Sequence, residues 1–408
     1  MISQQLNDQI TRIGPGSQAG AVLRRYWQPA ALVEELEHGD KVPVNLLGER
    51  LSLVQDEKGG LVLATRLATA DAAPTHYPAS AEIVIDPNGP TYPAVQKNGI
   101  IFAYLGPGTP PAFPNFDCFR APDSHVFAFK GLWECNWLQA LEIGIDPAHA
   151  SFLHRFLEDE DPDAGYGKQF RDKAAGTNMP ITQVLREYPR PDIQVDETDY
   201  GLKITALRHM ENELTHVRVT NQIFPEAICI PMSREMIITQ WHVPVDDENC
   251  YWFTMFTSFD KPVDKDVMRA QRLQEHTLPT YAPVKNRTND YHYDPNEQAT
   301  MTYTGMGLDI NVHDQWAVEG MGAIQDRTQE HLGRSDVAII RYRRMLRKAI
   351  ADLAEGRDSD LPMRGGNEVS NIAGPLSNDA IADTSDWSQA SHKLDMARRA
   401  ACPWDATV

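Results

Sequence analysis

Two histidines and an aspartate lie within the ten residues IDPAHASFLH, at positions 145 to 154. Two neutral imidazoles and one carboxylate are the ligands of mononuclear Fe(II) sites that keep positions open for dioxygen and substrate. The spacing of His149 and His154 does not by itself predict such a site, because residues five apart on an ideal helix diverge by about 140° around its axis. Both rings reach one point only if the helix unwinds or contains a π-bulge, and such distortions occur at functional sites.

A structural role explains the same stretch. Asp146 is suited to capping a helix, with Pro147 at the first helical position. The two histidines would then pack against neighbours or lie at the surface. From spacing alone, this is the simpler interpretation.

Composition restricts the classes of partner. The chain has 408 residues and a net charge of −19, which argues against binding to nucleic acid or to anionic membranes. No apolar run approaches the ~18 residues of a membrane span, and we identify no signal peptide. The five cysteines form no CxxC pair, so we expect a reducing cytoplasm.

The first 124 residues predict a helix at 16–27 and then short strands. Two hairpins are expected, at 50–65 and 91–106, because Gly59-Gly60 and Asn98-Gly99 separate apolar runs. The proline-rich stretch 106–124 predicts a linker.

After the linker the pattern is α+β. We expect a strand at 126–131, a helix at 132–144 and an antiparallel meander over 192–259. The stretch 335–356 predicts an amphipathic helix, whose basic residues we place on a solvated face: Arg341, Arg343, Arg344, Arg347 and Lys348.

The motif NWLQALEIGIDPAHASFLH, residues 136–154, resembles the mononuclear-iron motif N-W-x4-E-x3-D-x2-H-x4-H of Rieske-type aromatic-ring-hydroxylating oxygenases. The likeness is greatest to the large (alpha) subunits of the phthalate 4,5-dioxygenase group. Four more segments resemble that group in the same order: 12–32, 92–108, 215–225 and 314–336.

The resemblance implies an α+β fold with three parts. Residues 1–124 would form an N-terminal helix and an antiparallel β remnant of a Rieske-like domain. Residues 125–356 would form a helix-grip (Bet v1-like) catalytic domain around a central antiparallel sheet. Residues 357–408 would be an extended C-terminal tail.

The resemblance also implies the metal ligands. His149 and His154 match the iron-binding histidines, and Asp314 matches the carboxylate ligand from a distant helix. Asp309 and Glu319 are competing carboxylates, but the register D-x4-E followed by Met-Gly favours Asp314.

Further site residues follow from the same motif. Asp146 matches the aspartate that orients a ligand histidine and leads towards a neighbouring subunit's cluster, a catalytic role. Glu142 and Asn136 are weaker candidates for supporting positions, and Asn136 serves equally well as a helix cap. For a carboxylated aromatic substrate, Arg218 is the preferred contact and Arg208 a weaker one.

A full member of the family also carries a Rieske [2Fe–2S] cluster, held by C-x-H and C-x2-H. No cysteine precedes Cys118, and no cysteine of the chain has a histidine two or three residues after it. His76 is the sole candidate ligand in 64–89. We therefore expect Fe(II) but no [2Fe–2S] cluster in this chain.

Electrons would then come from outside the chain. A Rieske-bearing homologous subunit in a trimer or hexamer could supply them, or a ferredoxin or reductase. The predicted function is an oxygenase component that hydroxylates or demethylates an aromatic substrate with O2. Two alternatives are a non-catalytic or regulatory subunit of a mixed oligomer and a protein that binds a hydrophobic ligand without redox chemistry.

Overall fold

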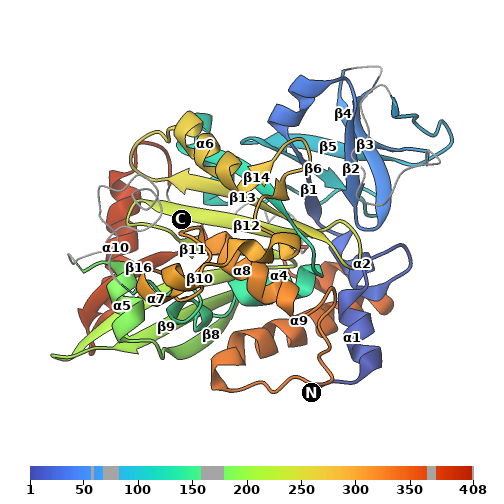
Figure 1. Ribbon diagram of the computed structural model, residues 1–408. Coiled ribbons are helices and arrows are strands. Elements are labelled where there is room, and N and C mark those ends of the chain that lie inside the picture. Colours follow the sequence, from blue (N-terminus) through green and yellow to red (C-terminus); the bar gives the residue numbers. More distant parts are fainter. Residues whose placement is uncertain (57–58, 68–81, 158–178, 365–373, 407–408) are drawn as a thin grey trace.

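The computed structural model describes residues 1–56, 59–67, 82–157, 179–364 and 374–406. Two large antiparallel sheets form the body of the protein, and most helices surround the larger sheet (Figure 1). The α+β class with antiparallel sheets is confirmed.

The N-terminal part contains two short helices and a six-stranded sheet. The predicted helix at 16–27 is shorter than expected, because Trp27 already begins the first strand. The helices are α1 (Gln4–Thr11) and α2 (Gln18–Leu23). The strands of the sheet are β1 (Trp27–Leu32), β2 (Val42–Leu46), β3 (Glu49–Gln55), β4 (Leu61–Thr65), β5 (Thr91–Lys97) and β6 (Ile100–Tyr104). Their order across the sheet is β1-β6-β5-β4-β3-β2.

Both predicted hairpins are present. β3 pairs with β4 and β5 pairs with β6, each antiparallel. Asn98 and Gly99 have φ angles of 40° and 88°, the left-handed backbone that an Asn-Gly turn supplies. His76, the sole candidate cluster ligand in its segment, lies outside the described residues.

The larger sheet has eight strands and carries the predicted meander. Its order is β7-β13-β12-β11-β10-β9-β8, with β16 also paired to β10. The strands are β7 (Val126–Trp133), β8 (Asp192–Thr198), β9 (Gly201–His209), β10 (Leu214–Ile223), β11 (Ala227–Pro231), β12 (Met236–Pro244), β13 (Cys250–Ser258) and β16 (Asn378–Asp383).

Helices and short elements connect these strands. The α-helices are α3 (Asp117–Arg120), α4 (Trp137–Gly144), α5 (Ile181–Glu187), α6 (Lys265–Glu275), α7 (Pro295–Thr300), α8 (Ile310–Gly320), α9 (Val337–Ala354) and α10 (Trp387–Ala401). The short 3-10 helices are η1 (Val33–His38), η3 (Asp123–His125), η4 (His149–Ser151), η5 (Arg287–His292), η6 (Arg334–Asp336) and η7 (Asp358–Asp360). A two-stranded ribbon consists of β14 (His276–Thr277) and β15 (Ala282–Pro283).

The extended tail predicted for 357–408 is wrong over most of its described length. β16 pairs with β10 from Leu214 to Val219, and α10 packs against it. Arg399 of α10 forms a fully buried ion pair with Asp117, at 2.8 Å. The sequence signal was weak because this segment is polar, and its strand is held by pairing and ion pairs rather than by an apolar stripe.

Two smaller expectations also change. The helix predicted at 132–144 begins only at Trp137, because Leu132 and Trp133 continue strand β7. The stretch 106–124 is a packed connection rather than a free linker: Phe102 of β6 contacts Phe119 and Trp241 of β12 edge to face, each with ring centroids 5.5 Å apart. The two sheets therefore share one hydrophobic core.

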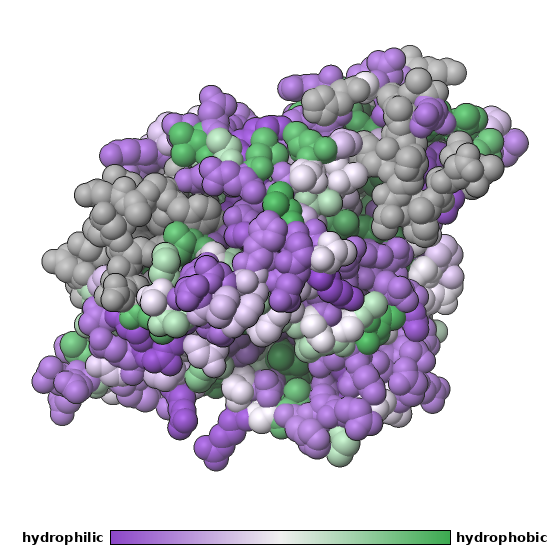
Figure 2. All heavy atoms as spheres, viewed as in Figure 1, coloured by the Kyte–Doolittle hydropathy of each residue, from purple (hydrophilic) through white to green (hydrophobic). Residues whose placement is uncertain are grey.

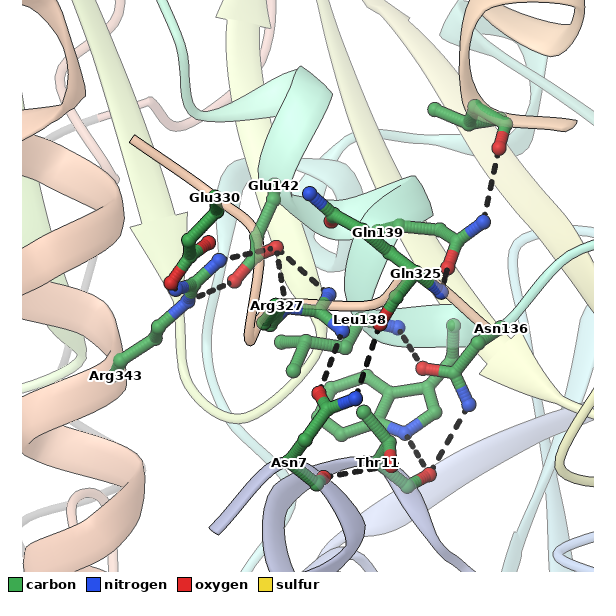
Figure 3. A network of polar contacts seen from close by, with 12 residues as sticks. Asn7, Thr11, Asn136, Leu138, Gln139, Glu142, Gln325, Arg327, Glu330 and Arg343 are labelled. Atoms are coloured by element: carbon green, nitrogen blue, oxygen red, sulfur yellow. Dashed lines mark hydrogen bonds and ion pairs between the residues drawn. The ribbon is translucent and has the colours of Figure 1, made fainter. Parts of the chain in front are cut away.

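Glu142 is the centre of a buried ionic clamp that fixes α4 (Figure 3). Its carboxylate accepts hydrogen bonds from Arg327, at 2.8 Å, and from Arg343 of α9, at 2.5 and 3.0 Å. Arg327 also donates to Asn7 of α1, and Arg343 to Glu330. Burial favours a raised pKa for Glu142, but the two guanidinium groups outweigh it and hold the pKa below its usual value.

The clamp corrects one sequence expectation. Arg343 was placed on the solvated face of its helix, but its side chain is only 9% exposed. The other members of the clamp are equally enclosed. The clamp thus joins α1, α4 and α9 through charges that cannot be hydrated by solvent.

Replacing Glu142 by Gln should destabilise the fold. Two buried guanidinium groups would lose their counter-charge, so we expect the free energy of unfolding to fall by about 3 kcal/mol, measured by urea denaturation. Glu134→Gln, an exposed neighbour on the same segment, is the matched control and should change it by less than about 0.5 kcal/mol. Equal stability of the two variants would contradict the clamp.

The buried carboxyl of Glu226 should make the free energy of unfolding depend on pH. Burial raises its pKa from 4.5 to about 8. The folded protein then keeps a proton that the unfolded chain loses above pH 4.5, so this group lowers stability by about 1.4 kcal/mol per pH unit up to pH 8.

Glu226→Gln should remove that slope. We expect the variant to gain stability over the native protein progressively from pH 5 to pH 8 in urea denaturation. Glu248→Gln, which is exposed, should leave the slope unchanged. Parallel pH profiles for native protein and Glu226→Gln would show that the group is ionised in the fold.

Candidate metal centre

The chain unwinds immediately after α4, in the segment that carries both histidines. Asp146 Oδ1 accepts from the backbone N–H of Ala148 at 2.8 Å, and Oδ2 accepts from that of His149 at 3.2 Å. These bonds start a single 3-10 turn, His149–Ser151, instead of an α-helix. Asp146 thus accepts two backbone N–H groups as a cap would, but the helix expected after it is only a short 3-10 turn that begins after Ala148, and the local unwinding removes the divergence of an ideal helix.

The unwinding brings the two rings to one point. His149 Nε2 and His154 Nε2 lie 3.2 Å apart, with the ring planes at 84°. Asp314 of α8 completes the group, since its Oδ1 lies 3.6 Å from His149 Nε2 and 3.2 Å from His154 Nε2.

These distances fit one metal ion. Adjacent ligands of an octahedral ion with bonds near 2.1 Å lie roughly 3 Å apart. Among the described residues, no hydrogen-bond donor in good geometry reaches the buried Asp314 Oδ1, an atom that a bound cation would satisfy. Within the described ranges, these three residues are the one set of His, Cys, Asp or Glu side chains that converges in this way.

The two competing carboxylates point elsewhere. Asp309 caps α8 by accepting from Asn311 N–H at 3.0 Å, and it pairs with Arg272 at 2.9 Å. Glu319 accepts from Tyr291 Oη at 2.6 Å and from a backbone N–H. The geometry therefore favours Asp314 over both.

Hydrogen bonds favour one tautomer of each of the two histidines. His149 Nδ1 donates to the backbone carbonyl of Asp146, which leaves the Nε2 lone pair for a metal. His313 Nε2 donates to the carbonyl of Gly307 at 2.9 Å, so its Nδ1 is an acceptor. That acceptor lies 3.5 Å from His154 Nδ1, which directs the His154 proton away from Nε2.

His313 is a functional candidate that the sequence analysis missed. It directly precedes Asp314, and this adjacency was the available signal. Burial lowers the pKa of His313 to about 4, so it is neutral at physiological pH, as an acceptor must be. Its Nδ1 faces Nδ1 of His154, as the backbone carbonyl of Asp146 faces Nδ1 of His149.

The electrostatics of the three residues suit a divalent cation. Burial lowers the pKa of His149, although Asp314 opposes this effect, so the ring is neutral and able to coordinate. Burial also raises the pKa of Asp314 to about 6, against the opposing effect of His149. A bound divalent cation would reverse that penalty.

A cavity of about 1270 Å³, including its opening to solvent, lies over the three residues. Its walls are mostly apolar and come from the face of the larger sheet and from the segment after α4, residues 145–157, here called the ligand loop. They include Trp133, Ile228, Ile230, Ile238, Phe156 and Phe256. Polar groups also reach it, among them Thr220, Gln240, His242 and Asn311. Such a lining suits a small, mostly apolar molecule.

The two arginines predicted for the substrate differ in position. Arg218 lines the cavity, but its guanidinium donates to Asp379 at 2.5 Å and to the Pro231 carbonyl at 2.9 Å. Arg208 is fully buried and donates to the Pro147 carbonyl and to Ser151 Oγ, both at 3.0 Å. Burial lowers its pKa to about 10. Arg208 thus holds the ligand loop in place.

The two supporting candidates from α4 do not reach the centre. Asn136 caps α4 by accepting from Leu138 N–H at 3.1 Å, and it donates to the carbonyl groups of Thr11 and Asp247. Glu142 belongs to the ionic clamp. Both positions anchor the helix that ends at the ligand loop.

Comparison with known proteins decides the family. Residues 103–398 match the family model described as LigXa C-terminal domain like, which is most of the chain. The chain belongs to this family.

Curated relatives are oxygenase subunits. The tert-butanol monooxygenase / tert-amyl alcohol desaturase oxygenase subunit of Aquincola tertiaricarbonis is 27% identical over 85% of this chain and 77% of its own length. The phthalate 4,5-dioxygenase oxygenase subunit of Pseudomonas putida is 26% identical over 88% of each chain. The 5,5'-dehydrodivanillate O-demethylase oxygenase subunit of Sphingobium sp. is 27% identical over 88% of this chain and 82% of its own.

These relatives confirm the resemblance to Rieske-type oxygenase alpha subunits and to the phthalate 4,5-dioxygenase group. The protein is the catalytic type of subunit in that family, an oxidoreductase related to ring dioxygenases and demethylases. Among the described residues, no helix is both long and apolar enough to span a membrane.

Replacing His313 by Phe should weaken metal binding. His154 would lose the acceptor that sets its tautomer, so we expect anaerobic titration with Co(II) to show a dissociation constant raised by roughly 10- to 100-fold. His313→Gln, which keeps an acceptor, should recover part of the affinity. His392→Phe, exposed on α10, is the control for adding a phenyl ring. Unchanged affinity in His313→Phe would contradict a positioning role.

Proposed function

We propose that this protein is an oxygenase component whose mononuclear Fe(II) is held by His149, His154 and Asp314. The observation that carries the proposal is the convergence of the three donor atoms, 3.2 to 3.6 Å apart, at the wall of a mostly apolar cavity. The relation to Rieske-type oxygenase subunits supports iron as the metal. The reaction class is hydroxylation or demethylation of an aromatic substrate with O2, in aromatic catabolism.

The protein groups at the centre have distinct tasks. Bound iron would supply the activation of dioxygen. The Asp146 carbonyl and His313 direct the two Nε2 lone pairs, and Asp146 through its carboxylate maintains the unwound loop. Apolar walls position the substrate and exclude bulk water, which strengthens every charge interaction inside. We assign Asp146 the catalytic supporting role, on the path that leads to the electron donor.

The electron donor is external in this proposal. No cysteine precedes Cys118, so a Rieske [2Fe–2S] cluster has no ligand set in the sequence of this chain. Electrons would enter from a Rieske-bearing homologous subunit in a trimer or hexamer, or from a ferredoxin or reductase. Five cysteines without a CxxC pair favour a cytoplasmic location.

A second candidate function, that of a non-catalytic or regulatory subunit, has one observation in its favour. The missing cluster ligands are also what a non-catalytic or regulatory subunit of a mixed oligomer would show. The three converging ligands favour catalysis, since a subunit released from catalysis has no need to keep a buried carboxylate beside two histidines.

Metal analysis tests the iron site itself and separates it from a cavity that binds a hydrophobic ligand without redox chemistry. After anaerobic loading with Fe(II), we expect about one iron per chain and no acid-labile sulfide. His149→Ala should lose the iron, and His392→Ala, exposed on α10, should keep it. Native protein that stays free of iron would contradict the proposal.

Turnover tests the catalytic role itself. Combined with a Rieske oxygenase subunit and its reductase, the native protein should support oxygen-dependent product formation that His149→Ala abolishes. Activity that is equal with either protein would assign the chain a regulatory role.

The curated relatives differ in the charge of the substrates that their names give. Their names include an uncharged alcohol, tert-butanol, and a dicarboxylate, phthalate.

A further inference from the structure

Arg218, the arginine that lines the cavity from the larger sheet, faces a carboxylate from the C-terminal segment. Arg218 of β10 and Asp379 of β16 are direct cross-strand partners. Their side chains form an ion pair at 2.5 Å, with only 18% and 13% of each side chain exposed. Burial tends to raise the pKa of Asp379, but Arg218 and His216 outweigh it and hold the pKa below its usual value. Asp379 is therefore ionised and neutralises the arginine.

A neighbouring histidine holds Asp379 in that position. His216 Nε2 lies 3.0 Å from Asp379 Oδ1, while Arg218 bonds Oδ2. The second terminal nitrogen of Arg218 donates to the Pro231 carbonyl at 2.9 Å. Both terminal nitrogens of the guanidinium are thus engaged before any substrate enters.

A second guanidinium in the cavity wall is paired in the same way. Arg272 of α6 and Asp309, the cap of α8, both line the cavity and lie 2.9 Å apart, each almost fully buried. Asp309 is also fixed by the backbone of Asn311. This pair likewise offers no net positive charge.

The remaining charges of the described lining are negative. Asp146 and Asp314 both face the cavity. A divalent cation at the metal centre would offset their two charges, and the two ion pairs are already balanced. A substrate anion would therefore gain no uncompensated cation from these walls, and would have to displace Asp379 in a poorly hydrated site.

We propose that the cavity selects an electrically neutral, mostly apolar substrate, and that Asp379 determines this selectivity by occupying Arg218. This inference rests on the proposed function and names its substrate class. It revises the expectation that Arg218 recognises a substrate carboxylate. Without Asp379, the same guanidinium would present two donors suited to a carboxylate.

The test compares benzamide with benzoate, which are alike in shape and differ in charge. Affinities for both compounds would be measured by isothermal titration calorimetry at pH 8 under anaerobic conditions, on Fe(II)-loaded protein and on metal-free protein. We expect the native protein to bind benzamide at least about tenfold more tightly than benzoate, because an unpaired buried carboxylate costs at least this much. In Asp379→Asn, we expect affinity for benzoate to rise by about tenfold.

Two further variants make the result specific. Asp383→Asn removes the same charge from the exposed end of the same strand and should leave both affinities unchanged. The double variant Arg218→Gln/Asp379→Asn should lose the gain for benzoate and keep benzamide binding. Thermal unfolding would verify that each variant is folded, and if Asp379→Asn does not fold, the native benzamide-to-benzoate ratio and the double variant decide.

The failures can be told apart. Native protein that binds benzoate as tightly as benzamide, or a folded Asp379→Asn that gains no affinity for benzoate, would overturn the inference. Protein that binds no iron but still prefers benzamide in the metal-free titration would overturn the proposed function alone.

Discussion

Two histidines five residues apart must aim at one point, and an α-helix cannot do this. The chain meets this constraint by ending α4 at Gly144 and beginning a single 3-10 turn at His149. The carboxylate of Asp146 stabilises the new path through two backbone N–H groups. Arg208 stabilises the same loop by donating hydrogen bonds to the Pro147 carbonyl and to Ser151 Oγ. A buried arginine and an aspartate are thus used to maintain a few residues of irregular backbone.

The third ligand comes from a different helix, so α4 and α8 must be held at a fixed distance. Gln139 provides the link, because its amide donates to the carbonyl groups of Val318 and Gly322, at 2.8 and 2.7 Å. The same amide accepts from Gln325 N–H (Figure 3). The Glu142 clamp fixes the same helix to α1 and α9. Polar groups inside the core therefore set the relative position of the ligands. By contrast, the outer face in Figure 2 is largely hydrophilic, with hydrophobic side chains in small separate groups.

The sequence predicted the class of fold, both N-terminal hairpins and the antiparallel meander, because these depend on local alternation and turn residues. It identified the three converging side chains only through motif likeness, since the spacing of His149 and His154 opposed a helix. It missed His313, Arg343 and the strand β16 for a shared reason. Each acts through a partner far away in the chain: Gly307 and His154, Glu142, and β10. Local periodicity carries no information about such partners.

The cost of the ligand set to the metal-free fold argues that it is kept for use. In the part of the chain that the structure describes, no donor satisfies the buried Asp314 Oδ1, and burial raises the pKa of its carboxyl to about 6. A protein selected for stability alone would favour an apolar side chain there, because an unsatisfied buried polar group costs about 1–3 kcal/mol. The cavity arginines follow the opposite rule, since both are paired with carboxylates. Among the described residues of the cavity wall, both arginines are thus paired with carboxylates, whereas the buried Asp314 Oδ1 would be stabilised by a cation, as the proposed iron site requires.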